Sequence, residues 1–129
     1  MREQRYSDMT SKKMVLVGTH AGEDPDRATI PFVMANAALA SETDAVVILQ
    51  SVGVMLAVKD QAKFIHAEGF PPLQDLMSSY MEMGGKILVC APCLKARNIT
   101  EADLIPGAKI IAAATVIAES TTADSTLVY

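Results

Sequence analysis

Short apolar runs alternate with helical patterns along this chain of 129 residues, and the alternation limits the folds that it can adopt. The runs are rich in Val, Ile and Leu, as is typical of strands buried on both faces. They cover residues 13–17, 45–49, 87–89, 109–114 and 125–129. Strands that alternate with helices form mostly parallel sheets. The order therefore predicts an α/β fold: a three-layer, flavodoxin-like domain of about five mostly parallel strands with helices on both faces.

Two of the connecting segments carry clear helix signals. In the first, Asp24 can cap a helix that starts at Pro25, or Thr29 can cap a later start near Pro31. Apolar residues keep helical spacing with either start: Ile30, Val33, Met34 and Ala37. The second helix follows Pro71 and Pro72, ends at Gly84 and Gly85, and carries a stripe of larger residues: Leu73, Leu76, Met77, Tyr80 and Met81.

The remaining connections are shorter. Residues 50–72 have no clear pattern, although the apolar stretch 52–58 favours a short helix. Residues 100–104 predict one capped turn ahead of Pro106 and Gly107. Residues 116–120 form the core of a short helix before the last strand.

The two cysteines of the chain, Cys90 and Cys93, follow the third apolar run directly. Pro92 fits the first position of a helix, and the residue before a proline avoids the helical region. Cys90 is therefore expected at the carboxyl end of a strand, and Cys93 in the first turn of a helix. Ligands bind at that edge of an open α/β sheet, and a helix N-terminus favours a thiolate, the reactive form of cysteine. The pattern predicts a nucleophilic sulfur at Cys90, against the alternative of a small buried side chain.

Three further residues are candidates for supporting this sulfur. Lys95 and Arg97 can hold an anionic sulfur donor or steady a thiolate, or they can merely complement the end of the short helix. Asn98 can close that helix, because Asn tolerates the left-handed conformation. His20, in the loop after the first strand, is expected on the same sheet edge, as a base for Cys90 or as a solvated loop residue.

Composition and charge argue against several function classes. The net charge of −4, with no basic cluster beyond the N-terminal segment, argues against nucleic acid as a partner. No apolar run approaches the roughly 18 residues of a membrane helix, and no secretory signal is recognised. Two close cysteines without an export signal favour chemistry in a reducing compartment, the cytoplasm. A zinc site would need two ligands besides the thiolates, and His20 and His66 are the two histidines of the chain, so we expect neither a metal nor a cofactor.

The domain organisation is simple. Residues 1–12 are polar and without periodicity, which predicts a mobile N-terminal tail, and residues 13–129 are expected to form a single domain. Half of the residues are apolar, yet the chain has no Trp. This apolar composition is high for a small chain. It favours a homo-oligomer, in which part of the apolar surface is buried between copies of the chain.

Several of these features agree with one known family. They are Gly18 after the first strand, the Ser-Val-Gly-Val turn at 51–54, the acidic turn at 101–104 and the closing strand at 125–129. With the specific block Val-Cys-Ala-Pro-Cys-Leu-Lys-Ala-Arg at 89–97, they make the chain from Met14 to Tyr129 resemble the DsrE/DsrF-like family of small sulfur-relay proteins.

The resemblance implies roles for particular residues. In the sulfur-transfer members of the family, the cysteine at the end of this strand carries a persulfide, and Cys90 is the residue that matches it. Cys93 is shared with only part of the family, and it can be a resolving thiol, a second relay site or packing. Many relatives have Arg-Gly after the helix, where this chain has Arg97 and Asn98. Members resemble the fold predicted above and commonly assemble as trimers, hexamers or related rings.

Three function classes follow. The first is a sulfur relay, a sulfurtransferase-like persulfide carrier on Cys90 whose partners are sulfur donor and acceptor proteins or small thiols. The second is a non-catalytic oligomeric binding module with structural cysteines, and the third is a dithiol–disulfide oxidoreductase that uses Cys90 and Cys93. The relay requires Cys90 and tolerates Cys93→Ser, the oxidoreductase requires both cysteines, and the module requires neither.

Overall fold

Five parallel strands form one sheet within residues 12–129, the part of the chain that the computed structural model describes. Their order across the sheet is β4-β3-β2-β1-β5. They are β1 (Lys13–Gly18), β2 (Asp44–Leu49), β3 (Lys86–Cys90), β4 (Ala108–Ile111) and β5 (Ser125–Val128). The predicted α/β fold with a parallel sheet is confirmed. The tail predicted for residues 1–12 lies outside the described residues, except for Lys12.

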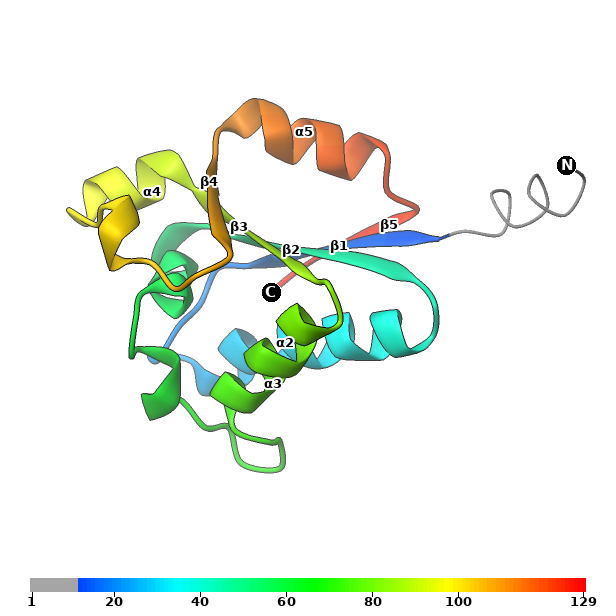
Figure 1. Ribbon diagram of the computed structural model, residues 1–129, viewed down its shortest axis with the longest axis horizontal. Helices are drawn as coiled ribbons and strands as arrows, with labels where there is room; N and C mark the ends of the chain where they lie inside the picture. The colour runs from blue at the N-terminus through cyan, green and yellow to red at the C-terminus, as the bar shows by residue number, and fades with distance from the viewer. Residues whose placement is uncertain (1–11) are drawn as a thin grey trace, which may run out of the picture.

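Helices α2 (Pro25–Ala40) and α3 (Leu73–Glu82) cover one face of this sheet, below the strands in Figure 1. Of the two starts predicted for α2, the earlier is correct. Asp24 accepts a hydrogen bond from the N–H of Arg27 at 3.1 Å, and Pro25 occupies the first turn. Pro31 lies inside the helix.

The buried face of α2 differs from the stripe that spacing predicted. Ala37 is exposed, and Ile30, Val33 and Met34 are only half-buried. The sheet is covered instead by a neighbouring row of side chains: Ala28, Phe32, Ala35 and Ala38. Most sides of this helix carry apolar residues, so spacing alone does not select the face that turns inward.

The stripe predicted for α3 is confirmed. Leu73, Met77 and Tyr80 are buried, and the helix is followed by Gly84 in the left-handed conformation, with φ +88°. The ring of Tyr80 packs edge-on against Phe32 of α2, with 5.9 Å between the ring centroids. This contact joins the two helices of the layer.

The hydroxyl of Tyr80 joins α3 to the middle of the sheet. It accepts hydrogen bonds from the N–H groups of Lys86 (2.9 Å) and Val47 (3.2 Å). Its O–H can donate a hydrogen bond to the carbonyl of Ala45 (2.8 Å) or to that of Lys86 (2.6 Å). Burial raises the pKa of this hydroxyl, so it remains a neutral donor and acceptor at every physiological pH. One side chain therefore satisfies backbone groups of two adjacent strands, β2 and β3.

The opposite face of the sheet is covered by α5 (Ala113–Thr121), above the strands in Figure 1. Beneath α5, apolar residues of four strands form a buried cluster: Val15, Val17, Val46, Ile48, Leu88 and Ile111. The strand predicted for residues 109–114 is too long, because β4 ends at Ile111 and α5 already begins at Ala113. Ala is the strongest helix former, and a short apolar run does not distinguish a strand from a helix.

The connections at the carboxyl edge of the sheet are short helical turns. The 3₁₀ helix η1 (Ser51–Ala57) follows β2, where a short helix was expected, and η2 (Ala62–Phe64) follows η1. After α4 (Ala91–Ala96), η3 (Glu101–Asp103) has the predicted cap, in which Thr100 and Asp103 bond each other reciprocally. No helix among residues 12–129 is long and apolar enough to cross a membrane.

Candidate functional site

The two cysteines lie where the sequence predicted them. Cys90 is the last residue of β3, and Cys93 lies in the first turn of α4. Both side chains are half-buried at the carboxyl edge of the sheet. Asn98 ends the helical segment in the left-handed conformation, with φ +57°, and its N–H donates to the carbonyl of Lys95 at 3.1 Å. The predicted closure by Asn98 is confirmed.

The two sulfur atoms touch. Only 2.6 Å separates Sγ of Cys93 from Sγ of Cys90, and both cysteines are free. At this distance one S–H can donate to the other sulfur. If one sulfur became part of a persulfide or a disulfide, the other would be within reach to attack it, as thiol–disulfide exchange inside one site requires. The sequence predicted that the cysteines would be neighbours, but only the structure shows that their sulfurs meet.

A backbone N–H holds Cys93 from the other side. Ser51, the first residue of η1, donates its N–H to Sγ of Cys93 at 3.2 Å. Ser51 adopts φ +55°, a left-handed conformation that is uncommon for a residue other than glycine. Strained backbone of this kind costs roughly 1–3 kcal/mol and concentrates at functional sites. The hydrogen bond fixes the position of the Cys93 sulfur at the sheet edge. Sequence reasoning missed this contact, although the turn at 51–54 contributed to the family resemblance.

Gly53 fixes the position of that N–H. This glycine packs directly on the chain after β1, so that a Cβ at position 53 would overlap the carbonyl oxygen of Gly18. Its own N–H donates to the carbonyl of Gln50 at 2.9 Å, which closes the turn. The close approach of two backbones therefore sets where Ser51 meets the cysteines.

The electrostatics of Cys90 differ from the prediction. Burial raises the pKa of the Cys90 thiol, and the hydrogen bond that its neutral thiol shares with the Cys93 side chain raises it further. The N–H of Cys93 and the charge of Arg97 act in the opposite direction, with smaller effect. The sequence predicted an activated thiolate at Cys90, and this is wrong for the reduced pair. Helix α4 is only six residues long, so its dipole is small compared with the cost of burying a charge.

The three predicted supporting residues have hydrogen-bond partners other than sulfur, or are exposed. Arg97 donates from Nη1 to the carbonyl of Cys93 at 3.1 Å, and Lys95 is exposed. Nδ1 of His20 lies 2.8 Å from a carboxylate oxygen of Glu23. In the described part of the chain, no hydrogen bond joins any of the three to a cysteine sulfur. Their roles toward a donor molecule stay predictions.

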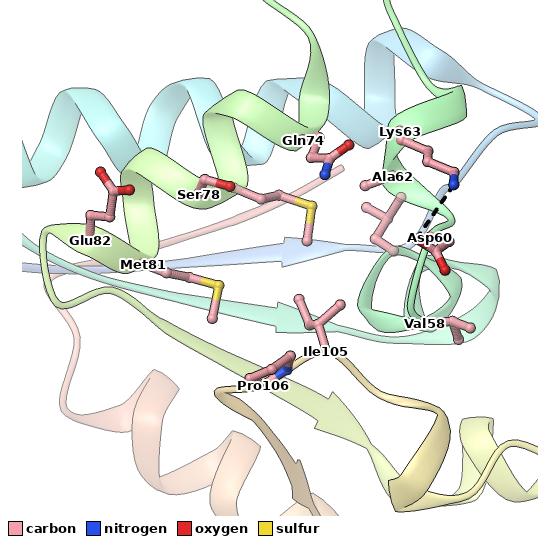
Figure 2. Close-up of a pocket in the computed structure, with 12 residues that line it drawn as sticks. Val58, Asp60, Ala62, Lys63, Gln74, Ser78, Met81, Glu82, Ile105 and Pro106 are labelled. Atoms are coloured by element: carbon pink, nitrogen blue, oxygen red, sulfur yellow. Dashed lines mark hydrogen bonds and ion pairs between the residues drawn. The ribbon is translucent and has the colours of Figure 1, made fainter.

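A recess of about 370 Å³ lies apart from the cysteines, between α3, η1 and the residues that precede β4. Figure 2 shows residues that line it. Its lining includes Met77, Met81 and Ile105, and Nζ of Lys63 lies 3.5 Å from a carboxylate oxygen of Asp60. Neither cysteine lines it. Among residues 12–129, no cluster of three or more His, Cys, Asp or Glu side chains could hold a metal ion.

Comparison with known proteins identifies the family. The profile of the DsrE/DsrF-like family matches residues 12–129. The chain belongs to the DsrE/DsrF-like family. This is a family of the sulfur-relay type, and its profile covers both cysteines and the whole sheet. For a DsrE/DsrF-like chain, the sheet edge that carries Cys90 and Cys93 is therefore the candidate site.

Individual relatives agree with this assignment. The chain is 33% identical over 98 residues to uncharacterized protein MJ0989 of Methanocaldococcus jannaschii, a match that covers 76% of this chain and 82% of that protein. The crystal structure of the ychN protein from E. coli has a TM-score of 0.78 at 22% identity, covering 92% of this chain and 99% of that one. MTH1491, a protein of unknown function from Methanobacterium thermoautotrophicum, has a TM-score of 0.71 at 14% identity, with coverage of 92% and 99%. These two structures show that the DsrE/DsrF-like chain shares their fold.

Proposed function

We propose that this protein carries sulfane sulfur as a persulfide on Cys90 and passes it to an acceptor thiol. The observation that carries the proposal is the free, half-buried cysteine pair at the carboxyl edge of the sheet, with 2.6 Å between its sulfurs. Membership of a sulfur-relay type of family supports it. The resemblance of the block at 89–97 to the sulfur-transfer members implies that Cys90 is the persulfide-bearing residue. Since the thiols must be free, we place the protein in a reducing compartment, the cytoplasm.

The relay consists of two balanced thiol exchanges. The Cys90 thiolate attacks the outer sulfur of a donor persulfide R–S–SH, the donor S–S bond breaks, and R–SH leaves with the proton of the Cys90 thiol. Cys90–S–SH then gives its outer sulfur to an acceptor thiol and becomes a thiol again. The partners are accordingly proteins or small molecules with a thiol or persulfide. The exposed cations Lys95 and Arg97 suit donors that carry negative charge.

The contacts of the cysteine sulfurs favour Cys90 over Cys93 as the residue that carries the persulfide. Sγ of Cys93 lies between the N–H of Ser51 and Sγ of Cys90, so two of its sides are already occupied. An added sulfur on Cys93 would share the space around Sγ with both of these contacts. Cys90 is therefore the better carrier.

The test is intact mass after mixing a reduced variant with glutathione persulfide. Cys93→Ser should gain the mass of one sulfur atom, and the matched variant Cys90→Ser should gain none. The pKa of the Cys90 thiol is raised, so the thiolate is scarce near neutral pH and the loading rate should increase with pH across the alkaline range. Loading of Cys90→Ser at the rate of Cys93→Ser would contradict the assignment.

A dithiol–disulfide oxidoreductase is the second candidate, because the sulfur contact of 2.6 Å also suits formation of a disulfide. The same intact-mass measurement distinguishes an oxidoreductase from a relay. An oxidoreductase exchanges with disulfide substrates, loses two hydrogens and needs both cysteines, whereas its single variants retain no sulfur. A binding module with structural cysteines would show neither change.

We also propose that copies of the chain assemble through the α5 face. Ile117 on α5 is 62% exposed and Val128 on β5 is 67% exposed. Val128 pairs with Val17 of β1, so both side chains point to the face that α5 covers. Apolar side chains exposed to this degree on one face are typical of a subunit interface, in this case of a trimer or hexamer.

Ile117→Asp should convert the assembly into monomers, because a buried, unpaired carboxylate is costly at an interface. The measurement is molar mass by light scattering after size exclusion. Phe64→Asp is the matched control, since Phe64 is 76% exposed on η2, remote from α5 in the fold, and should leave the mass unchanged. A monomeric parent protein, or dissociation by Phe64→Asp alone, would rule out the α5 face.

A further inference from the structure

We propose that Cys93 resolves the Cys90 persulfide, so that the cysteine pair reduces sulfane sulfur to hydrogen sulfide and ends as the Cys90–Cys93 disulfide. The inference rests on the proposed persulfide at Cys90 and adds a second activity to it. The pair releases sulfide when no acceptor thiol takes the sulfur first. Its geometric basis is the line of contacts from the Ser51 N–H through Sγ of Cys93 to Sγ of Cys90.

The first step in the argument is the distance. Any persulfide on Cys90 keeps its inner sulfur in place, 2.6 Å from Sγ of Cys93 in the reduced structure. A thiol held beside a persulfide has a very high effective concentration compared with a thiol in solution. Resolution inside the pair should therefore be faster than attack by a free small thiol.

The second step is the position of Cys93. Its sulfur accepts a hydrogen bond from the N–H of Ser51 at 3.2 Å. Ser51 adopts φ +55° in the turn that Gly53 packs against Gly18, so this contact fixes Cys93 beside Cys90. A nucleophile that is already positioned next to the sulfur it attacks loses little freedom on reaching the transition state.

The reaction balances without a further reactant. The Cys93 thiolate supplies an electron pair to the inner sulfur of Cys90–S–SH, the bond to the outer sulfur breaks, and HS⁻ leaves. The outer sulfur gains two electrons, and the two cysteines lose them as they form the disulfide. A thiol reductant in the compartment then restores the pair: two R–SH give R–S–S–R and the two cysteine thiols. The disulfide form cannot be loaded, so the redox state of the cell controls the relay.

The test is a single turnover with one equivalent of glutathione persulfide and no added reductant. The reduced parent protein should release about one sulfide per chain and lose two hydrogens in mass. Cys93→Ser should instead keep one extra sulfur and release sulfide at least tenfold more slowly. Ser78→Ala is the control, because Ser78 is exposed on α3 and lines the recess that neither cysteine lines, and it should release sulfide within about twofold of the parent rate.

The outcomes separate the two proposals. If the parent and Cys93→Ser both keep the extra sulfur for the same time, Cys93 is not a resolving thiol and the relay on Cys90 stands. If neither protein gains sulfur or releases sulfide, the relay itself fails, and the further inference fails with it. Sulfide release by Cys90→Ser at the parent rate would overturn the proposed order of the two cysteines.

Discussion

Gly53→Ala should lower the free energy of unfolding by about 1–3 kcal/mol, the usual cost of overpacking a site that cannot relax. The added Cβ would overlap the carbonyl oxygen of Gly18 and come within 3.1 Å of Cα of Thr19. Both neighbours are backbone atoms, so no side chain can rotate away. The turn must shift instead, and it carries the Ser51 N–H that contacts Cys93. We therefore expect reduced stability together with slower release of sulfide by the cysteine pair.

Denaturation by urea measures the first effect, and the single-turnover assay measures the second. Gly22→Ala is the matched control. A Cβ at position 22 would meet only the side chain of Ile65, at 3.8 Å, and Gly22 is exposed. Its stability should stay within about 1 kcal/mol of the parent protein. Equal effects of the two substitutions would show that the contact of Gly53 with Gly18 does not constrain the fold.

Tyr80→Phe should destabilise the protein by about 2–4 kcal/mol, although it removes a single oxygen atom. The N–H groups of Val47 and Lys86 lose an acceptor, and the carbonyl of Ala45 loses a donor. A buried polar group left without its partner costs about 1–3 kcal/mol, and this site has several. The ring contact with Phe32 is retained, so the loss reports the hydroxyl alone.

The control for this substitution is Tyr129→Phe. Tyr129 is half-buried at the end of the chain, and its backbone, not its side chain, makes the hydrogen bonds to Thr19 and Val17 that the structure records for it. The free energy of unfolding should therefore change by less than about 0.5 kcal/mol. Denaturant titrations of both variants measure the two changes in the free energy of unfolding. A loss below 1 kcal/mol for Tyr80→Phe would mean that water or a shifted backbone replaces the hydroxyl.

Much of the fold could be predicted because its signals are local. Apolar runs, prolines and glycines located the strands and the stripe of α3 within a few residues, and they gave Asp24 as one of two possible starts of α2. The same local rules placed Cys90 at a strand end and Cys93 in the first helical turn. Pro92 restricts its own φ and Asn98 tolerates a positive φ, so the positions of the turn and of the end of α4 follow from local sequence.

The structure alone decided what depends on distant segments. Which side of α2 is buried, and where β4 gives way to α5, depend on packing, because apolar residues occupy every alternative. The Ser51 N–H reaches Cys93 across 42 positions of sequence, and no local pattern predicts a contact of that kind. Burial raised the pKa of the Cys90 thiol, where the sequence pointed only to the helix dipole that would lower it. The sequence by itself determined that Cys90 and Cys93 lie at the carboxyl edge of the sheet, whereas tertiary packing decided the contacts of their sulfurs and the burial of Cys90.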